Sequence, residues 1–116
     1  MYLILFVLDN PDQLEELLNA WEQAGTGGAT VLVSTGLRRL TDSGFRDDVP
    51  LMPGLDDFYK HIEDYHRTLF TIVKDDATLE KVVAATQSVA GDLNQPNTGI
   101  LVVMPTVRVY GLEKNL

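Results

Sequence analysis

Two adjacent arginines, Arg38 and Arg39, are the residues whose type and spacing best suit the binding of a ligand. They stand out because the chain has only 9 Lys and Arg against 17 Asp and Glu. Paired guanidinium groups hold carboxylate or phosphate in two-point geometry. The pair predicts a site for a small anionic ligand. The alternative, pairing with the chain's own acids, stays open, since such surface ion pairs are common and worth little.

Other chemistry-bearing residues are weaker candidates. His61 and His66 lie near Asp57 and Asp64, but two histidines among scattered acids are a poor metal signal, and no metal is predicted. The acids at 75 and 76 suit the start of a helix, where capping and the helix dipole favour them, better than acid/base work. No Ser-His-Asp order, P-loop or dinucleotide fingerprint is present. We therefore predict no catalytic residue.

Composition narrows the class of protein. The 116 residues suit a single domain spanning 1–116, and the absence of cysteine excludes disulfides and thiolate chemistry. The net charge of −8 argues against nucleic acid and against anionic membrane surfaces. The apolar run at the start lacks a basic leader and is too short to span a bilayer. A cytoplasmic protein with no membrane insertion is predicted.

The elements that must position the arginines begin with that apolar run, Tyr2–Leu8, which has the length and pattern of a buried strand. Asn10 can cap a following helix with Pro11 in its first position, and Gly25 closes it. The apolar stripe of this helix includes Trp21, which is predicted to lie in the core. Residues 30–33 read as the strand that delivers the arginines.

Beyond the arginines, residues 40–65 lose periodicity and carry many turn and breaker residues, so a long loop is predicted, with a short helix possible at 56–64. Loops of this length are often functional. Its apolar side chains either dock on the protein itself or meet a partner: Phe45, Leu51, Met52 and Leu55.

The rest of the chain reads as a strand at His66–Val73, a capped helix ending at Gly91, a polar loop, and a strand at residues 99–104. The second helix has an apolar face predicted from Leu79, Val82, Val83, Val89 and Ala90. Residues 106–110 alternate in the manner of an edge strand.

An internal repeat relates the two halves. A shift of 65 residues places Leu5–Leu8 on Phe70–Val73 and Asn10 on Asp75 without a gap across about twenty positions. Each half reads strand, capped helix, glycine, strand. Two such units predict the ferredoxin-like βαββαβ fold: a four-stranded antiparallel sheet with both helices on one face, and a long loop between strands two and three.

The first and fourth strands are apolar at nearly every position instead of alternating. Helices cover only one face of the predicted sheet, so the other face is also expected to be apolar. Exposed apolar sheet faces mark association surfaces. A homo-oligomer with its open faces packed together is therefore predicted.

Taken together, the chain resembles the PII superfamily of nitrogen regulatory signalling proteins. The resemblance rests on the GATV strand opening, on Gly36 before the arginines, on the long acidic loop, on the IVKDD run and on the closing GILVVMP. It implies the same βαββαβ fold, a homotrimer, an adenine nucleotide in the cleft between subunits, and a T-loop, here about residues 40–65, that contacts a partner protein.

The resemblance also implies a set of ligand-binding residues. Thr30 and Gly36 correspond to positions for base and sugar, and the loop root meets the phosphates. The family's second phosphate-binding turn corresponds to residues 94–99. The full predicted set is Thr30, Gly36, Leu37, Arg38, Arg39, Asn97, Thr98, Gly99 and Arg108.

The chain departs from the family at several of these positions. Leu40 replaces the glutamine after the second arginine, Ile100 replaces the phosphate-binding lysine, and the paired arginines of the last strand are reduced to Arg108 and Tyr110. Such a set suits AMP or ADP, or another anion, better than ATP.

Two functions from different classes follow. The first is a non-enzymatic signal-transduction module that binds a small anionic effector and presents residues 40–65 to a partner. The second is a small ferredoxin-like enzyme of the monooxygenase or isomerase kind, for which His66 is the candidate polar residue in an apolar pocket. A trimer favours the first and a dimer the second. An amino-acid-sensing regulatory domain is a third, weaker option.

Overall fold

The computed structural model describes residues 1–35 and 66–112. The remaining residues, 36–65 and 113–116, lie outside the described part. The predicted short helix at 56–64 and the loop at 40–65 fall there. The described elements are β1 (Tyr2–Leu8), η1 (Pro11–Gln13), α1 (Leu14–Ala24), β2 (Thr30–Ser34), β3 (His66–Val73), α4 (Asp76–Ala90) and β4 (Ile100–Pro105).

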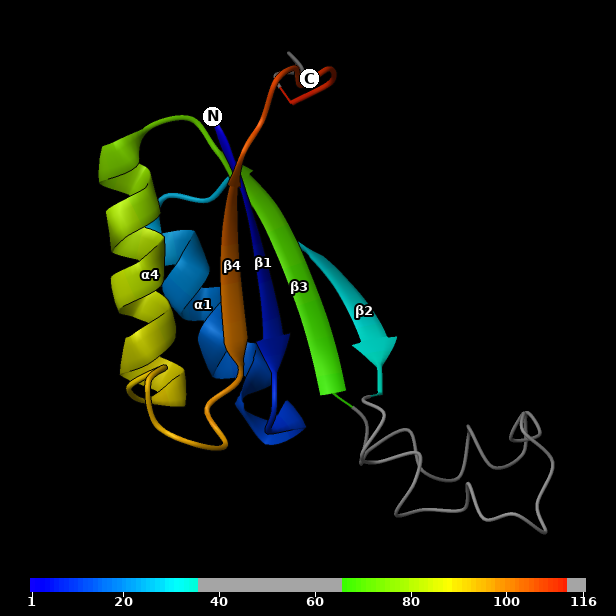
Figure 1. The fold of residues 1–116 in the computed structure, drawn as a ribbon, viewed down its shortest axis with the longest axis vertical. Coiled ribbons are helices and arrows are strands. Elements are labelled where there is room, and N and C mark those ends of the chain that lie inside the picture. The colour runs from blue at the N-terminus through cyan, green and yellow to red at the C-terminus, as the bar shows by residue number, and fades with distance from the viewer. Residues whose placement is uncertain (36–65, 113–116) are drawn as a thin grey trace, which may run out of the picture.

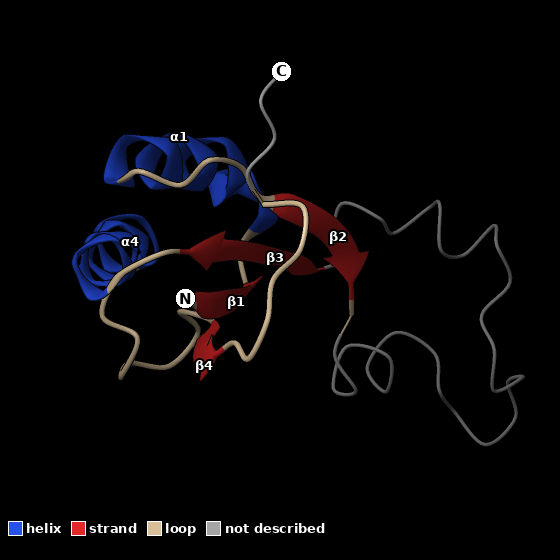
Figure 2. Ribbon diagram, turned by 90° about the horizontal axis from the view of Figure 1, so that it is seen from above, coloured by secondary structure: helices blue, strands red, loops and turns tan. Residues whose placement is uncertain are grey.

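The four strands form one antiparallel sheet in the order β2-β3-β1-β4. Both helices lie on the same face of this sheet, as Figure 1 and Figure 2 show from perpendicular directions. This is the βαββαβ ferredoxin-like arrangement, and the predicted fold class is confirmed. No helix among residues 1–35 and 66–112 is long and apolar enough to cross a membrane.

The predicted helix caps are largely confirmed, although α1 begins at Leu14 and a 3₁₀ turn occupies the predicted first helical positions. The Asn10 side chain accepts a hydrogen bond from the Asp12 backbone N–H, and a short 3₁₀ turn leads into α1. Asp75 accepts in the same way from Thr78 at the start of α4. Gly25 ends α1 in the left-handed region, at φ 106°, which glycine adopts without strain.

The 65-residue repeat is visible in space as an approximate twofold axis. Leu5 and Phe70, which are equivalent in the repeat, face each other directly in the β1–β3 ladder. The equivalent pair Trp21 and Thr86 also meet, because the indole Nε1–H donates to the Thr86 hydroxyl over 2.8 Å. The axis therefore passes between the two halves through the sheet centre and the helix contact.

The core lies between the helices and one face of the sheet, which we call the covered face. Its side chains are 0–2% exposed, and Trp21 is among them as predicted. The burial alternates along the central strands, with every second residue of β1 and β3 fully enclosed. The buried apolar residues are Ile4, Phe6, Leu8, Leu17, Trp21, Leu69, Val73 and Val82.

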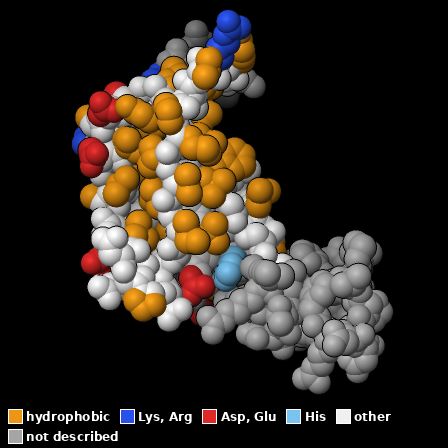
Figure 3. All heavy atoms as spheres, in the orientation of Figure 1, with side chains coloured by type: hydrophobic (Ala, Val, Ile, Leu, Met, Phe, Trp, Pro, Cys, Tyr) orange, Lys and Arg blue, Asp and Glu red, His pale blue; other side chains and the backbone are white. Residues whose placement is uncertain are grey.

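The other face of the sheet, the open face, is also apolar. The strand register places on it these apolar residues, which alternate with the core: Leu3, Leu5, Val7, Leu32, Phe70, Ile72, Ile100, Val102 and Met104. Polar residues of β2 and β3 share this face: Thr30, Ser34, His66 and Thr68. Several of the apolar residues are well exposed, with Ile100 at 65% and Leu32 at 52%. Figure 3 shows hydrophobic side chains gathered over the strands along the length of the sheet.

Two sequence predictions are corrected. Residues 106–110 do not form an edge strand, because β1 has no residue left to pair with them: the ladder ends at Tyr2↔Pro105, and Thr106 N–H bonds to the Met1 carbonyl. The second correction concerns α4, where Val83 is only half-buried and stands outside the core cluster. Thr86 takes the core position instead, at 0% exposure.

Candidate ligand-binding site

Among residues 1–35 and 66–112, two of the hollows that could receive a small molecule lie at opposite ends of the sheet. We call the first the glycine cavity. It has a volume of about 420 Å3 and is lined by Gly27, Gly28, Ala29, Thr30, Phe70, Thr71, Ile72, Gly111 and Leu112. This volume falls within the range of small-molecule pockets.

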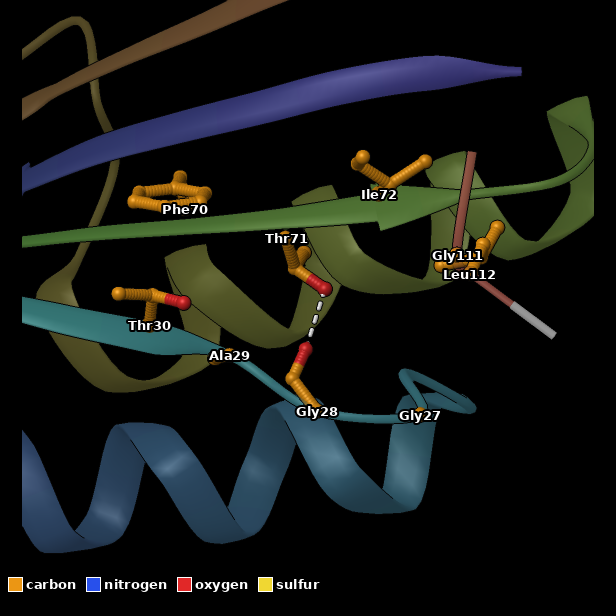
Figure 4. A pocket seen from close by; sticks show the side chains of 9 residues that line it. All are labelled: Gly27, Gly28, Ala29, Thr30, Phe70, Thr71, Ile72, Gly111 and Leu112. Atoms are coloured by element: carbon orange, nitrogen blue, oxygen red, sulfur yellow. Dashed lines mark hydrogen bonds between the residues drawn. The ribbon is translucent and has the colours of Figure 1, made fainter. Parts of the chain in front are cut away.

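The glycine cavity is formed where α1 returns to the sheet through a glycine-rich turn. Figure 4 shows Phe70 and Ile72 on one side of β3 and Thr71 on the other, directed toward Gly28. The Thr71 hydroxyl donates to the Gly28 carbonyl and so ties the turn to the sheet. The Phe70 ring can contact a flat apolar group, while the Thr30 hydroxyl supplies a hydrogen bond. The cavity thus suits a planar heterocycle.

The second hollow, which we call the histidine cavity, has a volume of about 220 Å3 and is lined by Val7, Asp9, His66, Asn97, Gly99 and Ile100. It lies where β1 ends and where β3 and β4 begin. His66 is the first residue of β3, and Asp9 directly follows β1, so the antiparallel ladder brings them to one edge. The distance from His66 Nε2 to Asp9 Oδ1 is 3.2 Å.

The turn before β4 shapes one wall of the histidine cavity. Asn97 has φ 63° and Gly99 has φ 101°, both in the left-handed region that glycine and asparagine tolerate best. A Cβ at Gly99 would lie 2.3 Å from the Val7 carbonyl oxygen, so only glycine fits against β1 here. The Thr98 hydroxyl donates to the Gln95 carbonyl, which holds the turn closed.

The described members of the predicted ligand set are divided between these hollows. Thr30 lines the glycine cavity, while Asn97 and Gly99 line the histidine cavity, with Thr98 between them in the chain. Arg108 is exposed, past the end of β4 opposite to Asn97. The six residues of β4 span about 20 Å. One chain therefore does not bring Arg108 and Asn97 together.

The loop root, Gly36 with Leu37, Arg38 and Arg39, lies outside the described residues. Ser34, the last residue of β2, pairs with His66. The chain therefore enters the predicted loop from the same end of the sheet as the histidine cavity. That end also carries the 97–99 turn, although β2 and β4 stand on opposite edges, about 14 Å apart across three strand spacings.

Sequence reasoning missed two contributors to these hollows. Asp9 was not singled out, although an acid that directly follows a buried strand lies at the sheet end where His66 begins the next strand. Phe70 was assigned only to a strand. Its place in the glycine cavity depends on the register Thr30↔Phe70, which the sequence alone does not give.

No protein-family model matches the chain, and no curated protein matches it.

Proposed function

We propose that this protein is a PII-like signal-transduction subunit. In this proposal it forms a homotrimer through the open sheet faces, binds a small anionic effector such as an adenine nucleotide between subunits, and presents residues 40–65 to a partner protein. It has no catalytic residue in this function. Regulation of nitrogen metabolism is what the resemblance implies for its context.

The observation that carries the proposal is the placement of the two cavities on a sheet with an apolar open face. Each cavity holds only part of the predicted ligand set, and they lie at opposite ends of the strands. A neighbouring copy packed against the open face can bring its histidine cavity to the glycine cavity of the first. The ligand would then lie between two chains, its ring in one cavity and its polar end in the other.

Association itself is supported by the apolar character of the open face. A monomer rarely leaves a continuous apolar sheet exposed. Here Val102, Met104 and Ile100 of β4 are 39%, 41% and 65% exposed. The strand on the other edge contributes Leu32. The number of three subunits comes from the PII resemblance. In a cyclic assembly the open face of every subunit is covered through the same contact.

The charge of the site favours a ligand with few phosphates. Ile100 stands where the family has its phosphate-binding lysine, and no Lys or Arg is among the described residues that line either cavity. The cations of the predicted ligand set are Arg38, Arg39 and Arg108. We therefore propose AMP or ADP as the effector in preference to ATP.

The deciding experiment is native mass spectrometry of the undialysed protein, which reports subunit number and retained ligand together. We expect a trimer, with bound nucleotide released as AMP or ADP. Light scattering at micromolar concentration supplies an independent mass. A monomer in both measurements would contradict the assembly.

Calorimetric titration of AMP, ADP and ATP tests the arginines. Charge-assisted contacts are worth roughly 1.5–3 kcal/mol each. Arg38→Ala and Arg39→Ala are therefore each expected to weaken AMP or ADP binding by about 10- to 150-fold. Lys81→Ala on the exposed side of α4 removes a charge away from both cavities and serves as the control. Unchanged affinity in both arginine variants would remove them from the site.

A second candidate function is supported by the histidine cavity. His66 is 19% exposed at its side chain and is oriented by Asp9 in a hollow with Val7 and Ile100 as apolar walls. A histidine held by a carboxylate is a common general base. In this reading the protein is a dimeric ferredoxin-like enzyme of the monooxygenase or isomerase type. A dimer in native mass spectrometry, with no retained nucleotide, would favour it.

A further inference from the structure

The Asp9 carboxylate lines the hollow that corresponds to the phosphate side of the proposed site, and this placement has consequences for the ligand. Asp9 is 37% exposed at its side chain, so it faces the hollow and solvent while its Oδ1 lies 3.2 Å from His66 Nε2. A carboxylate is an acceptor only and cannot donate to a phosphate oxygen. Any phosphoryl group in this hollow would meet a like charge.

Among the other described polar groups that line the histidine cavity, His66 alone can offset that charge, and only when its imidazole is protonated. Asp9 and His66 are the ionisable residues among the described residues that line this cavity. The Nε2 atom of His66 already contacts the Asp9 carboxylate. The pair is neutral with His66 protonated and negative with His66 neutral. Asn97 contributes a neutral amide and Ile100 an alkyl wall. These groups suit hydroxyls and amides, for which the carboxylate is a strong acceptor.

We propose that Asp9 is a specificity-determining residue of the site and that its carboxylate, held by His66, excludes a polyphosphate chain from the histidine cavity. Of the proposed effectors, AMP is then preferred over ADP, and ATP is the least favoured; the sugar hydroxyls of the ligand donate to Asp9. This proposal rests on the proposed function, because it concerns the nucleotide bound between the two cavities.

The exclusion should grow with ligand charge. A terminal phosphoryl group carries roughly 1.5 to 2 negative charges near pH 7, and each further group in a chain adds about one more. Repulsion from a partly exposed carboxylate is reduced by solvent but persists at contact distance. We expect removal of the Asp9 charge to favour ATP over AMP by about tenfold, which corresponds to about 1.4 kcal/mol.

The test is calorimetric titration of the full chain with adenosine, AMP and ATP, comparing the ratio of the ATP to the AMP dissociation constant. Asp9→Asn keeps the shape of the side chain and is expected to lower this ratio about tenfold. The matched control is Glu22→Gln, which removes the same charge from the exposed side of α1 and should leave the ratio unchanged.

A second variant tests the same idea without disturbing the Asp9–His66 pair. Ile100→Lys adds a cation to the same hollow at a side chain that is 65% exposed, and it should also lower the ratio. Ile100 lies on the open face, so its replacement could also alter assembly. A lowered ratio supports the proposal only if light scattering gives the variant the same mass as the parent.

The outcomes separate this inference from the proposed function. If the parent binds nucleotide and neither Asp9→Asn nor Ile100→Lys alters the ratio, Asp9 does not set specificity, while the nucleotide site survives. A parent that already prefers ATP would also overturn the role of Asp9. If no nucleotide binds to the parent or to any variant, the proposed function fails, and the proposal for Asp9 fails with it.

Discussion

Both faces of the sheet carry many apolar side chains, but among the described strand residues only the covered face holds fully buried ones. On the covered face Phe6 and Leu69 are 0% exposed beneath the helices. On the open face Leu32 and Val102 are 52% and 39% exposed, although their side chains are as apolar. Phe6 and Leu69 lie on the central strands β1 and β3, whereas Leu32 and Val102 lie on the edge strands β2 and β4. Along each strand, side chains of the two faces alternate residue by residue.

The difference shows what the continuous apolar pattern of β1 and β4 means. Strands with one solvated face read as alternating apolar and polar residues, whereas strands covered on both faces read as apolar runs. Helices account for one cover only. No described element covers the open face, and a further copy of the chain is the cover that we propose.

The strongest test of the contrast uses one phenylalanine from each face. Phe6→Ala should lower the free energy of unfolding by about 3–5 kcal/mol, since it leaves a cavity in the core. Phe70→Ala should cost less, and its cost should shrink as the protein is diluted, because that side chain would act on association. Urea denaturation at two protein concentrations distinguishes the two. Equal losses at both concentrations for both variants would mean that the open face contributes to folding alone.

A charged substitution on the open face should disrupt the proposed self-association directly. Val102→Glu places a carboxylate in the proposed interface, where an unpaired charge costs several kcal/mol to bury. We expect at least about a hundredfold weaker self-association, with helix content preserved in circular dichroism. The matched control is Val107→Glu, at a residue that is 97% exposed on the segment after β4. Assembly that survives Val102→Glu, by light scattering, would place the interface elsewhere.

Much of the fold could be predicted from local residue patterns. Apolar runs give β1 and β3 with their observed ends, and Asn10, Gly25, Asp75 and Gly91 cap helices as expected. The 65-residue repeat then fixes the topology. What failed depends on partners far away in the chain. Residues 106–110 alternate like a strand, yet β1 ends at Tyr2 and offers them no ladder.

The candidate site was less predictable than the fold. Residue type and family pattern led to Thr30, Asn97 and Gly99, which do line hollows. Local patterns could not say that these residues belong to two hollows at opposite ends of the sheet. Asp9 was missed for a related reason, since its significance depends on the imidazole of a residue 57 positions later, across the β1–β3 ladder.

Two glycines, one lining each cavity, differ in the space around their Cα atoms: Gly99 is enclosed and Gly27 is open. Replacing each with alanine compares the two surroundings. Gly99→Ala should destabilise the fold by about 1–3 kcal/mol, because the backbone has φ 101° and the new Cβ would strike the Val7 carbonyl and the Phe6 ring. Gly27→Ala has no atom within 4 Å of the new Cβ and should be neutral or slightly stabilising. Thermal unfolding compares them. A Gly99→Ala variant as stable as the parent would disprove the close approach to β1.

The smallest effect concerns the two helices that make the covered face, whose equivalent caps differ in chemistry. Asp75 caps α4 as a carboxylate, and its hydrogen bond from the Thr78 backbone N–H holds its pKa below the ordinary value of 3.8. Asn10 caps the 3₁₀ turn η1, which leads into α1, with an amide that does not titrate in this range. A lowered folded-state pKa contributes stability that is present above pH 3.8 and is lost as pH falls through the folded value.

Acid should therefore loosen the start of α4 before the start of α1. Asp75→Asn keeps an acceptor for Thr78 and removes the titration, so the stability advantage of the parent over this variant should be lost as pH falls from 3.8 through the lower folded-state pKa of Asp75. The reciprocal variant, Asn10→Asp, should introduce the same pH dependence at the other helix, where the helix dipole also favours a carboxylate. Hydrogen exchange at Thr78 and Asp12 between pH 3 and pH 5 follows each cap separately. If the Thr78 amide exchanges with the same pH dependence in the parent and in Asp75→Asn, the carboxylate is not the acceptor that starts α4. The asymmetry between the two halves would then have to arise from their different lengths, 11 residues in α1 against 15 in α4.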